Sequence, residues 1–190
     1  MTAFEHVTAL LSFVYALALT HLLARIAELV VARERVRFSG LLALGMVNAV
    51  LLVFINWLSL WDLRSVKSWD IVSIAVQFLF AIALYFLCVV VGPKTPDEGT
   101  IDLEDFYWRQ RPYIYGVLLS IVILSLIANI AFLKSANASL FVKENLTVLP
   151  MLIPVALALV SRSRWAQWVG GLGYLALALA YTILFCSTLS

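Results

Sequence analysis

One stretch of this chain carries ionisable side chains inside a long apolar segment. His21, Arg25 and Glu28 follow one another within residues 5–33, at separations of four and three. On an α-helix these separations place neighbouring side chains on one face, within reach of each other. Charged groups are costly in hydrocarbon, so the cluster should face protein or a water-filled cavity. Two interpretations of Arg25 and Glu28 stay open: an ion pair beside His21, or side chains that extend to the membrane boundary and end the helix.

His6 is the other histidine of the chain and lies near the start of the same segment. His6 and His21 are 15 residues apart, about 22 Å along a helix, so they cannot bind one metal ion or haem iron within it. We therefore expect no metal and no cofactor. The ordinary role of His21 is a hydrogen bond to another helix. A protein that binds a lipid or cofactor beside His21 is a further, weaker possibility.

Polar side chains in other apolar segments could continue a path across a membrane. Asn56, Gln77 and Asn129 come from three different segments at comparable depth, and we expect them to converge on a vestibule beneath His6. Asn48, in the opposite half of the membrane, is a secondary candidate. The commoner role of such residues is to hydrogen-bond across helices and hold them together.

The composition indicates an integral membrane protein. Hydrophobic residues make up 64% of the chain and charged residues 13%, whereas soluble domains are about half apolar and a quarter charged. The net charge of +2 comes without a block of Lys and Arg, so nucleic acid is excluded as a main partner. We find no His-Glu-x-x-His, Cys-x-x-Cys or Gly-x-Ser-x-Gly motif in the sequence, and we do not expect an enzyme.

Six apolar segments approach the roughly 20 residues that a helix needs to cross the hydrocarbon core. They predict an all-α integral membrane protein, a six-transmembrane-helix bundle that forms one polytopic domain over residues 1–190. The expected helices cover about 7–31, 41–60, 71–91, 113–133, 146–160 and 165–188. The fifth is short and contains Pro150 and Pro154; it could begin near Ser139 instead of after Glu144.

The connections carry unequal numbers of Lys and Arg, which predicts the orientation. Eight basic residues follow the first, third and fifth helices, and four follow the second and fourth. Cytoplasmic connections are enriched in basic residues, so the connections with eight basic residues should lie in the cytoplasm. Both termini should then lie on the outer side of the membrane, which we expect to be a bacterial inner membrane. Three helices precede the loop 92–112 and three follow it, an arrangement that an inverted repeat would produce.

The cytoplasmic loop 92–112 should contain a short amphipathic helix along the membrane surface. Asp102 can cap its start and Pro112 would end it. The helix could anchor the next transmembrane segment. Alternatively, its acidic residues Asp102, Glu104 and Asp105 could form a docking surface for a partner protein.

These patterns favour a small transporter or channel-like protein that moves an ion or small solute through a polar pathway lined by the first helix. The pathway would use His21, Arg25 and Glu28 at the inner end, and the positive Arg25 would favour an anion or a proton-coupled small molecule. The alternative is a non-transporting accessory, sensor or scaffold subunit of a larger membrane complex. Besides membrane lipids, we expect a second copy or a partner membrane protein, because 190 residues enclose little interior.

Overall fold

Long apolar helices make up most of the molecule. The computed structural model describes residues 3–65, 70–96, 98–133 and 145–185. Five helices in these ranges are long and apolar enough to cross a membrane: α1 (Ala3–Val31), α2 (Gly40–Ser59), α3 (Ile71–Val91), α4 (Leu103–Leu133) and α7 (Arg164–Phe185). A shorter apolar stretch, Asn145–Val160, contains the 3₁₀ turn η3 (Leu149–Met151) and helix α6 (Leu152–Val160). These helices are those of a multi-pass membrane protein.

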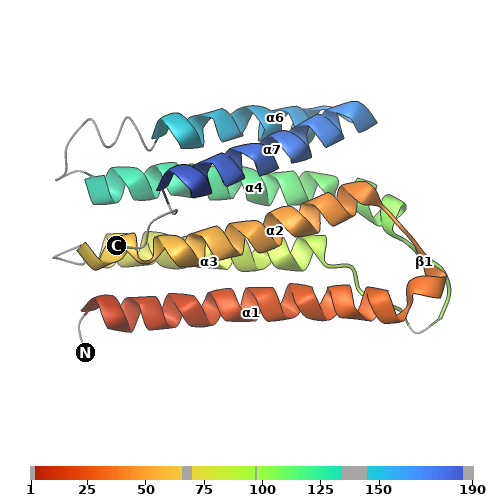
Figure 1. Ribbon diagram of the computed structural model, residues 1–190, viewed down its shortest axis with the longest axis horizontal. Coiled ribbons are helices and arrows are strands. Elements are labelled where there is room, and N and C mark those ends of the chain that lie inside the picture. The colour runs from red at the N-terminus through yellow and green to blue at the C-terminus, as the bar shows by residue number, and fades with distance from the viewer. Residues whose placement is uncertain (1–2, 66–69, 97, 134–144, 186–190) are drawn as a thin grey trace.

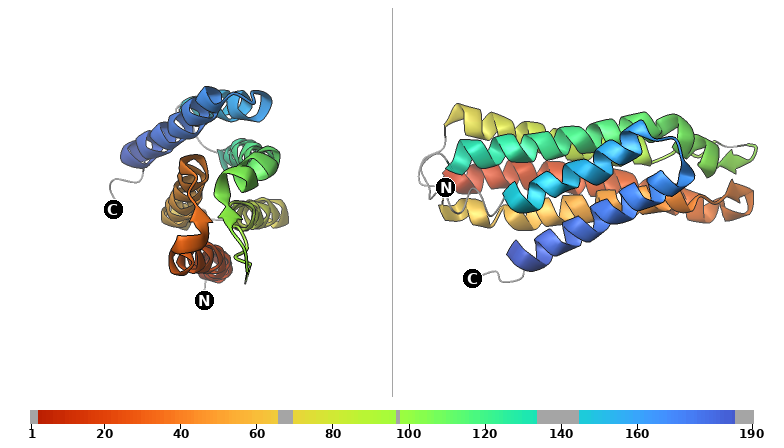
Figure 2. Two further views of the ribbon diagram at one scale, coloured as in Figure 1. Left: turned by 90° about the vertical axis from the view of Figure 1, so that its right-hand side faces the viewer. Right: turned by 90° about the horizontal axis from the view of Figure 1, so that it is seen from above.

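The helices lie side by side along one axis, and each runs opposite to the helix before it (Figure 1). The start of α1 and the end of α7 lie at the same end of the bundle (Figure 1). Seen along the axis, α6 and α7 form one side and α1 forms the opposite edge (Figure 2, left). Helix α1 packs mainly on α3, while α7 packs on α6 and α2. Helix α1 therefore lies at the periphery of the bundle.

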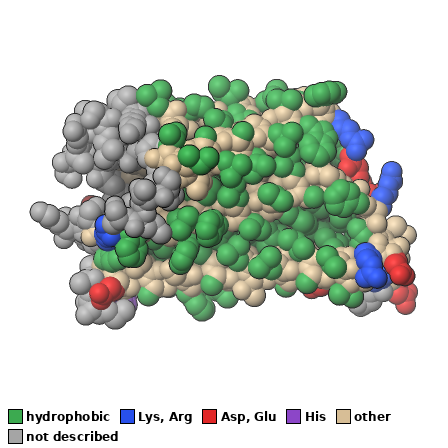
Figure 3. All heavy atoms as spheres, viewed as in Figure 1, with side chains coloured by type: hydrophobic (Ala, Val, Ile, Leu, Met, Phe, Trp, Pro, Cys, Tyr) green, Lys and Arg blue, Asp and Glu red, His purple; other side chains and the backbone are tan. Residues whose placement is uncertain are grey.

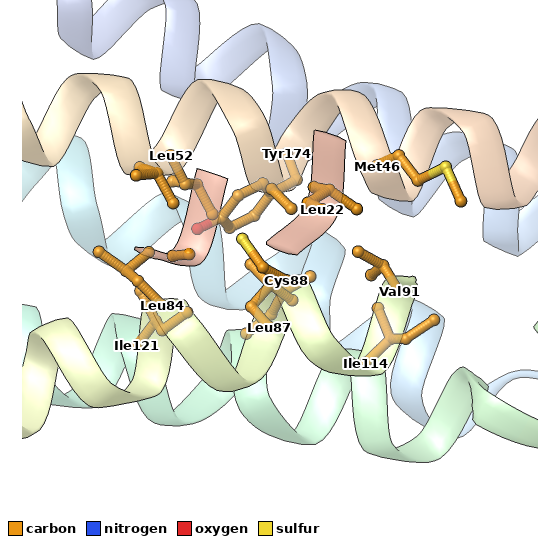
Figure 4. Close-up of a cluster of buried hydrophobic side chains, with 14 of the residues drawn as sticks. Leu22, Met46, Leu52, Leu84, Leu87, Cys88, Val91, Ile114, Ile121 and Tyr174 are labelled. Carbon is orange, nitrogen blue, oxygen red and sulfur yellow. The ribbon is translucent and has the colours of Figure 1, made fainter. Parts of the chain in front are cut away.

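The core is built from apolar side chains of every long helix. Leu22, Leu42 and Leu84 are fully buried, and the buried Tyr174 of α7 points into this core (Figure 4). Large hydrophobic side chains also cover the outer surface between the two ends, where charged groups are scarce (Figure 3). Such a surface suits hydrocarbon, in which backbone groups must be satisfied within the helices and apolar side chains need no burial.

Most of the basic residues gather at one end of the bundle, which we call the basic end: Arg33, Arg35, Arg37, Lys94, Arg109, Arg162 and Arg164. Strand β1 (Val36–Arg37), which follows the turn η1 (Arg33–Arg35), pairs in parallel there with β2 (Ile101–Asp102). Arg35 donates hydrogen bonds to the carbonyls of Pro96 and Gly99. This strand clasp ties the α1–α2 connection to the α3–α4 connection. At the other end, a second turn, η2 (Asp62–Ser65), follows α2.

The prediction of a separate amphipathic helix before residue 113 is wrong, because α4 runs unbroken through Pro112. A proline inside a helix removes one hydrogen bond, yet the helix continues when both flanks are held. Here Tyr107 and Arg111 before the proline, and Tyr115 after it, are all buried. Their shared packing against α6 and α7 keeps the two flanks in one helix. The predicted cap by Asp102 is confirmed: its Oδ1 accepts from the backbone N–H groups of Glu104 and Asp105, both at 3.0 Å.

Three of the other expected helices match closely at their starts, whereas α1 begins at Ala3, four residues before the expected position. Helices α2, α3 and α7 begin within one residue of the predicted positions 41, 71 and 165. The fifth expected segment is shorter than the others, and Pro150 lies in its 3₁₀ turn η3. The question of whether Lys143 and Glu144 belong to it lies outside the described residues.

Candidate functional site

A buried polar network joins α4, α6 and α7 near the basic end. Gln167 is fully buried, and its Nε2 donates to the carbonyls of Ala158 at 2.8 Å and Ser161 at 2.6 Å. Its Oε1 accepts from the hydroxyl of Tyr107 at 2.7 Å. Because Tyr107 gives its proton to Gln167, the Tyr115 hydroxyl must be the donor in the 3.3 Å contact between the two tyrosines. The network has a fixed direction of hydrogen bonds.

Arg111 adds a buried positive charge to the same place. Arg111 is only 7% exposed. Its Nη1 donates to the carbonyls of Ala158, at 3.1 Å, and Ser161. No carboxylate pairs with it among the described residues. The last carbonyls of a helix carry a partial negative charge, so the end of α6 can stabilise the guanidinium in place of an acid. A buried ionisable group in a membrane protein is a default candidate for function.

Local sequence explains why these groups meet. Tyr107, Arg111 and Tyr115 are spaced by four residues and share one face of α4. Gln167 lies in the first turn of α7, where the hydroxyl of Ser163 accepts from the N–H of Ala166 at 3.1 Å and caps the helix. The tight turn between α6 and α7 thus directs the Gln167 amide onto the end of α6.

Glycine makes this approach of α6 and α7 possible. A Cβ atom at Gly170 would lie 2.7 Å from the Cβ of Ala158 and 2.8 Å from the carbonyl oxygen of Pro154. Both distances are too short for any side chain, and one neighbour is backbone. Only glycine allows the two helices to pack this closely, as small residues do in membrane helix pairs.

Two small internal cavities lie on either side of Tyr174, which lines both. The larger has a volume of about 60 Å³, and its polar lining residues are Asn56, Ser59, Ser125 and Tyr181. The smaller, of about 10 Å³, reaches the polar network and is lined by Asn48, Tyr107, Tyr115 and Gln167. A cavity needs at least about 10 Å³ to hold one water molecule, so these spaces admit only small species.

Asn48 presents an unsatisfied acceptor beside the smaller cavity. Asn48 is only 4% exposed, and its Nδ2 donates to the carbonyl of Gly171 at 3.1 Å. Its Oδ1 is buried and has no hydrogen-bond partner in the described part of the chain. Buried polar atoms are nearly always paired, so an unpaired one next to a cavity suggests that a water or ligand completes it.

The expected cluster on α1 lies at the surface of the bundle. Arg25 and Glu28 form an ion pair with Nη1 2.8 Å from Oε2, and the Glu28 side chain is 43% exposed. The stem of Arg25 packs on Gly92, whose added Cβ would lie 3.1 Å from its Cγ. Both residues line an open groove of about 980 Å³ at the basic end, together with Arg33, Glu34, Arg35, Thr95 and Pro96. This geometry favours side chains that extend to the membrane boundary over an ion pair deep in the protein.

His21 does not join that groove. Its ring is half-buried and lies 6.1 Å from the ring of Tyr85 in α3, tilted by 50°. The expected interhelical hydrogen bond is absent among the described residues, and a ring contact takes its place. His6, 15 residues earlier in α1, is exposed.

The three outer candidates are not brought into one cavity. Asn56 lines the larger cavity and donates to the carbonyl of Leu52 in its own helix at 2.8 Å. Asn129 donates to Oδ1 of Asn145 at 3.2 Å, which links α4 to the start of the Asn145–Val160 segment. Gln77 is half-buried, and neither internal cavity has it in its lining. Of the three, only Asn56 lines one of these two cavities in the described part of the chain.

The acidic residues expected to dock a partner are engaged within the chain. Asp102 pairs with Arg37 at 2.9 Å as part of the strand clasp, and Asp105 pairs with Arg109 at 2.6 Å. The backbone N–H of Asp105, with help from the Arg37 guanidinium and the N–H of Glu104, holds the pKa of Asp102 below its ordinary value. These groups stabilise the start of α4.

Glu104 connects three elements. It accepts from the hydroxyl of Ser39 at 2.7 Å and from Nε1 of Trp108 at 3.1 Å, and Arg164 of α7 lies 3.4 Å away. Ser39 also caps α2, since its oxygen accepts from the N–H of Leu42. Glu104 therefore joins the first turn of α4 to the starts of α2 and α7.

Sequence reasoning missed the buried network because each member looked ordinary. Arg111 counted as a loop cation before Pro112, and Gln167 stood near the expected start of a helix beside Trp165 and Trp168. The four-residue spacing of Tyr107, Arg111 and Tyr115 was the available signal, but it becomes visible only if the helix is allowed to pass through the proline.

The chain matches no protein-family model, no curated protein and no solved structure. In the described part of the chain, no group of three or more His, Cys, Asp or Glu residues could hold a metal ion. The interpretation of the site therefore depends on its own chemistry.

Proposed function

We propose that this protein is a small transporter or channel-like protein for a small inorganic anion, with a path that runs between α2, α4 and α7. The observation that carries the proposal is the pair of internal cavities on either side of Tyr174. Both are lined by polar side chains from several helices, in a core that is otherwise apolar. Polar linings at such depth commonly mark substrate or ion pathways.

The chemistry of the lining favours an anion. Hydroxyl and amide groups supply the polar lining of both cavities, and no carboxylate lines either one among the described residues. At the smaller cavity the Gln167 amide and the Tyr107 and Tyr115 hydroxyls donate within the network. The donors left there for a solute are the Tyr174 hydroxyl and the second N–H of Asn48 Nδ2. The positive Arg111 does not line the smaller cavity, but it donates to the same two carbonyls as the lining residue Gln167. Anion-selective pores use positive side chains and hydrogen-bond donors in this way. The cavity volumes limit the solute to about the size of a water molecule or a halide.

The proposed path does not run along α1. Neither internal cavity includes an α1 residue in its lining, and the Arg25–Glu28 pair lies in an open groove at the edge of the bundle. We infer that Arg25 and Glu28 fix the end of α1, and that the residues to test first are Asn48, Ser125 and Tyr174.

The proposed topology has six passes, with both termini outside and the basic end in the cytoplasm of a bacterial inner membrane. The concentration of Arg and Lys at that end supports it, because cytoplasmic segments carry such an excess. Single-cysteine variants in a background without Cys88 and Cys186 test it. A cysteine at Arg162 should react with a membrane-impermeant maleimide only after the cells are opened, and reaction in intact cells would reverse the orientation.

The alternative, a non-transporting accessory subunit, has less support. Its expected docking surface consisted of Asp102, Glu104 and Asp105, and all three are paired within the chain. A subunit of this kind would have to use another surface.

Anion efflux from liposomes tests the function. Protein reconstituted with potassium chloride inside should release chloride when valinomycin carries potassium, and an ion-selective electrode records the rate. Asn48→Leu removes the amide at the smaller cavity, whose Nδ2 keeps one N–H beside its bond to the Gly171 carbonyl, and should slow efflux about 10- to 100-fold, the effect of losing one hydrogen bond to a charged group. Ser125→Ala should slow it less, because neighbouring hydroxyls remain.

Two variants with matched chemistry serve as controls. Thr182→Val and Ser120→Ala remove hydroxyls that bond only to carbonyls of their own helices, Ala178 and Gly116. Their efflux should equal that of the unmodified protein. The proposal is wrong if the protein releases no more chloride than empty liposomes, or if Asn48→Leu has no effect. A loss confined to His21→Ala, Arg25→Ala or Glu28→Gln would return the path to α1.

A further inference from the structure

A long apolar groove runs along the outer surface between α1 and α2. Its volume is about 740 Å³, within the range of small-molecule sites. Ile26, Leu29 and Val30 of α1 form one wall, and residues of α2 from Leu42 to Phe54 form the other. The groove exists because α1 packs mainly on α3 and leaves part of its α2-facing side uncovered.

The groove has the length of a lipid chain. On the α2 side it extends from Ser39 to Phe54, 15 residues or about 22 Å along the helix. One leaflet of the hydrocarbon core is about 15 Å thick, half of the roughly 30 Å of the whole core. A single acyl chain of the leaflet next to the basic end can therefore lie along the groove over its full depth.

A cation stands where the headgroup of such a lipid would lie. Arg33 follows the end of α1, lines the basic end of the groove and is exposed. Its neighbours Arg35 and Arg37 are engaged by the strand clasp. Arg33 itself has no hydrogen bond or ion pair among the described residues. It also lines the open groove of about 980 Å³ on the other side of α1, so there is space for a headgroup beside it.

We propose that this groove is a binding site for an anionic phospholipid of the basic-end leaflet, with one acyl chain between α1 and α2 and the phosphate on Arg33. Bilayer lipid is the default neighbour of any uncovered apolar face in a membrane. The unpaired guanidinium at one end adds a preference for a negative headgroup, since basic groups at the membrane surface attract anionic lipids. The site is separate from the cavities around Tyr174 and does not depend on the transport proposal.

Native mass spectrometry of the detergent-solubilised protein tests the site directly. The protein is titrated with phosphatidylglycerol and, separately, with phosphatidylcholine that has the same acyl chains. We expect phosphatidylglycerol to bind about fivefold more tightly, the effect of one cation near an anionic headgroup. Arg33→Gln should remove this preference, whereas Arg162→Gln, an exposed arginine at the same end that does not line the groove, should keep it.

A second pair of variants tests the acyl chain. Val47 is 53% exposed and lines the groove, so Val47→Trp fills it and should weaken the binding of both lipids. Ile153 of α6 is 72% exposed outside the groove, and Ile153→Trp should change neither. Equal binding of the two lipids to the unmodified protein, or unchanged binding in Val47→Trp, overturns the proposal. A dimer that Val47→Trp converts to a monomer also overturns it, because a second copy would then occupy the groove.

Discussion

Arg111 and Gln167 should be strongly coupled, because they donate to the same two carbonyl oxygens. The carbonyls of Ala158 and Ser161 each accept from both side chains. Removing one donor leaves each carbonyl with the other. Hydrogen bonds between membrane helices average about 0.6 kcal/mol and reach about 1.7 kcal/mol, so Arg111→Met or Gln167→Leu alone should cost about 1 kcal/mol. The double variant leaves both carbonyls unpaired, and each unpaired buried group costs about 1–3 kcal/mol.

With one such cost for each of the two carbonyls, the double variant should therefore lose about 2–6 kcal/mol more than the sum of the two single variants. Reversible unfolding by SDS in mixed micelles, followed by far-ultraviolet circular dichroism, measures each free energy. Tyr107→Phe is the reference, since it removes only the hydroxyl that donates to Gln167 and leaves both carbonyls paired. Energies that add within about 0.5 kcal/mol would show that the carbonyls are not the shared element, and would refute the reasoning.

Three further predictions concern packing, pH and the cap. Gly170→Ala should destabilise the protein by about 1–3 kcal/mol in the same unfolding assay through overpacking, while Gly116→Ala, whose Cβ meets nothing within 4 Å, should stabilise it by up to about 1 kcal/mol. Asp102 has a lowered pKa, so the protection that its ionised form gives is complete above its ordinary pKa of 3.8 and is lost as the pH falls through the lowered value. Hydrogen-exchange protection of the Asp105 amide should follow that course; constant protection at low pH would contradict it. Asp102→Asn keeps the capping oxygen and should retain protection of this amide, which Asp102→Ala should lose.

Most of the helices can be predicted from the length of the apolar segments and from the capping residues at their starts. The starts of α2, α3 and α4 depend on Ser39, Asp70 and Asp102, whose side chains accept from backbone N–H groups of the first turn. Such caps are local and can be predicted from a few residues. Pro112 misled the prediction because the contacts that hold a helix together across a proline come from α6 and α7, more than 40 residues away along the chain.

The candidate site was harder to predict, because depth and burial are properties of the packed bundle. Arg25 and Glu28 are indeed paired, as their spacing suggested, but a helix alone does not reveal whether that face meets protein or the edge of the bundle. Asn48 was named only as a secondary candidate, and its unpaired Oδ1 follows from the approach of Gly171 in α7. Polar residues that meet across helices become a site only when the register of those helices is known.

The unbroken α4 also relates the buried network to the thickness of the bilayer. Its 31 residues extend about 46 Å, whereas a hydrocarbon core of about 30 Å covers only about 20 of them. With Leu133 at one boundary, the other boundary falls near Tyr113, and Arg111 lies at the level of the headgroups. Bilayers that differ by about 3 Å, as natural membranes do, move that boundary by two residues, to Arg111 itself. Lipids of longer acyl chain would thus bring the protein-enclosed guanidinium within the depth of the hydrocarbon core, where the carbonyls of Ala158 and Ser161 stabilise it in place of water. The stability of the contact between α4 and α6 would then depend on the thickness of the membrane.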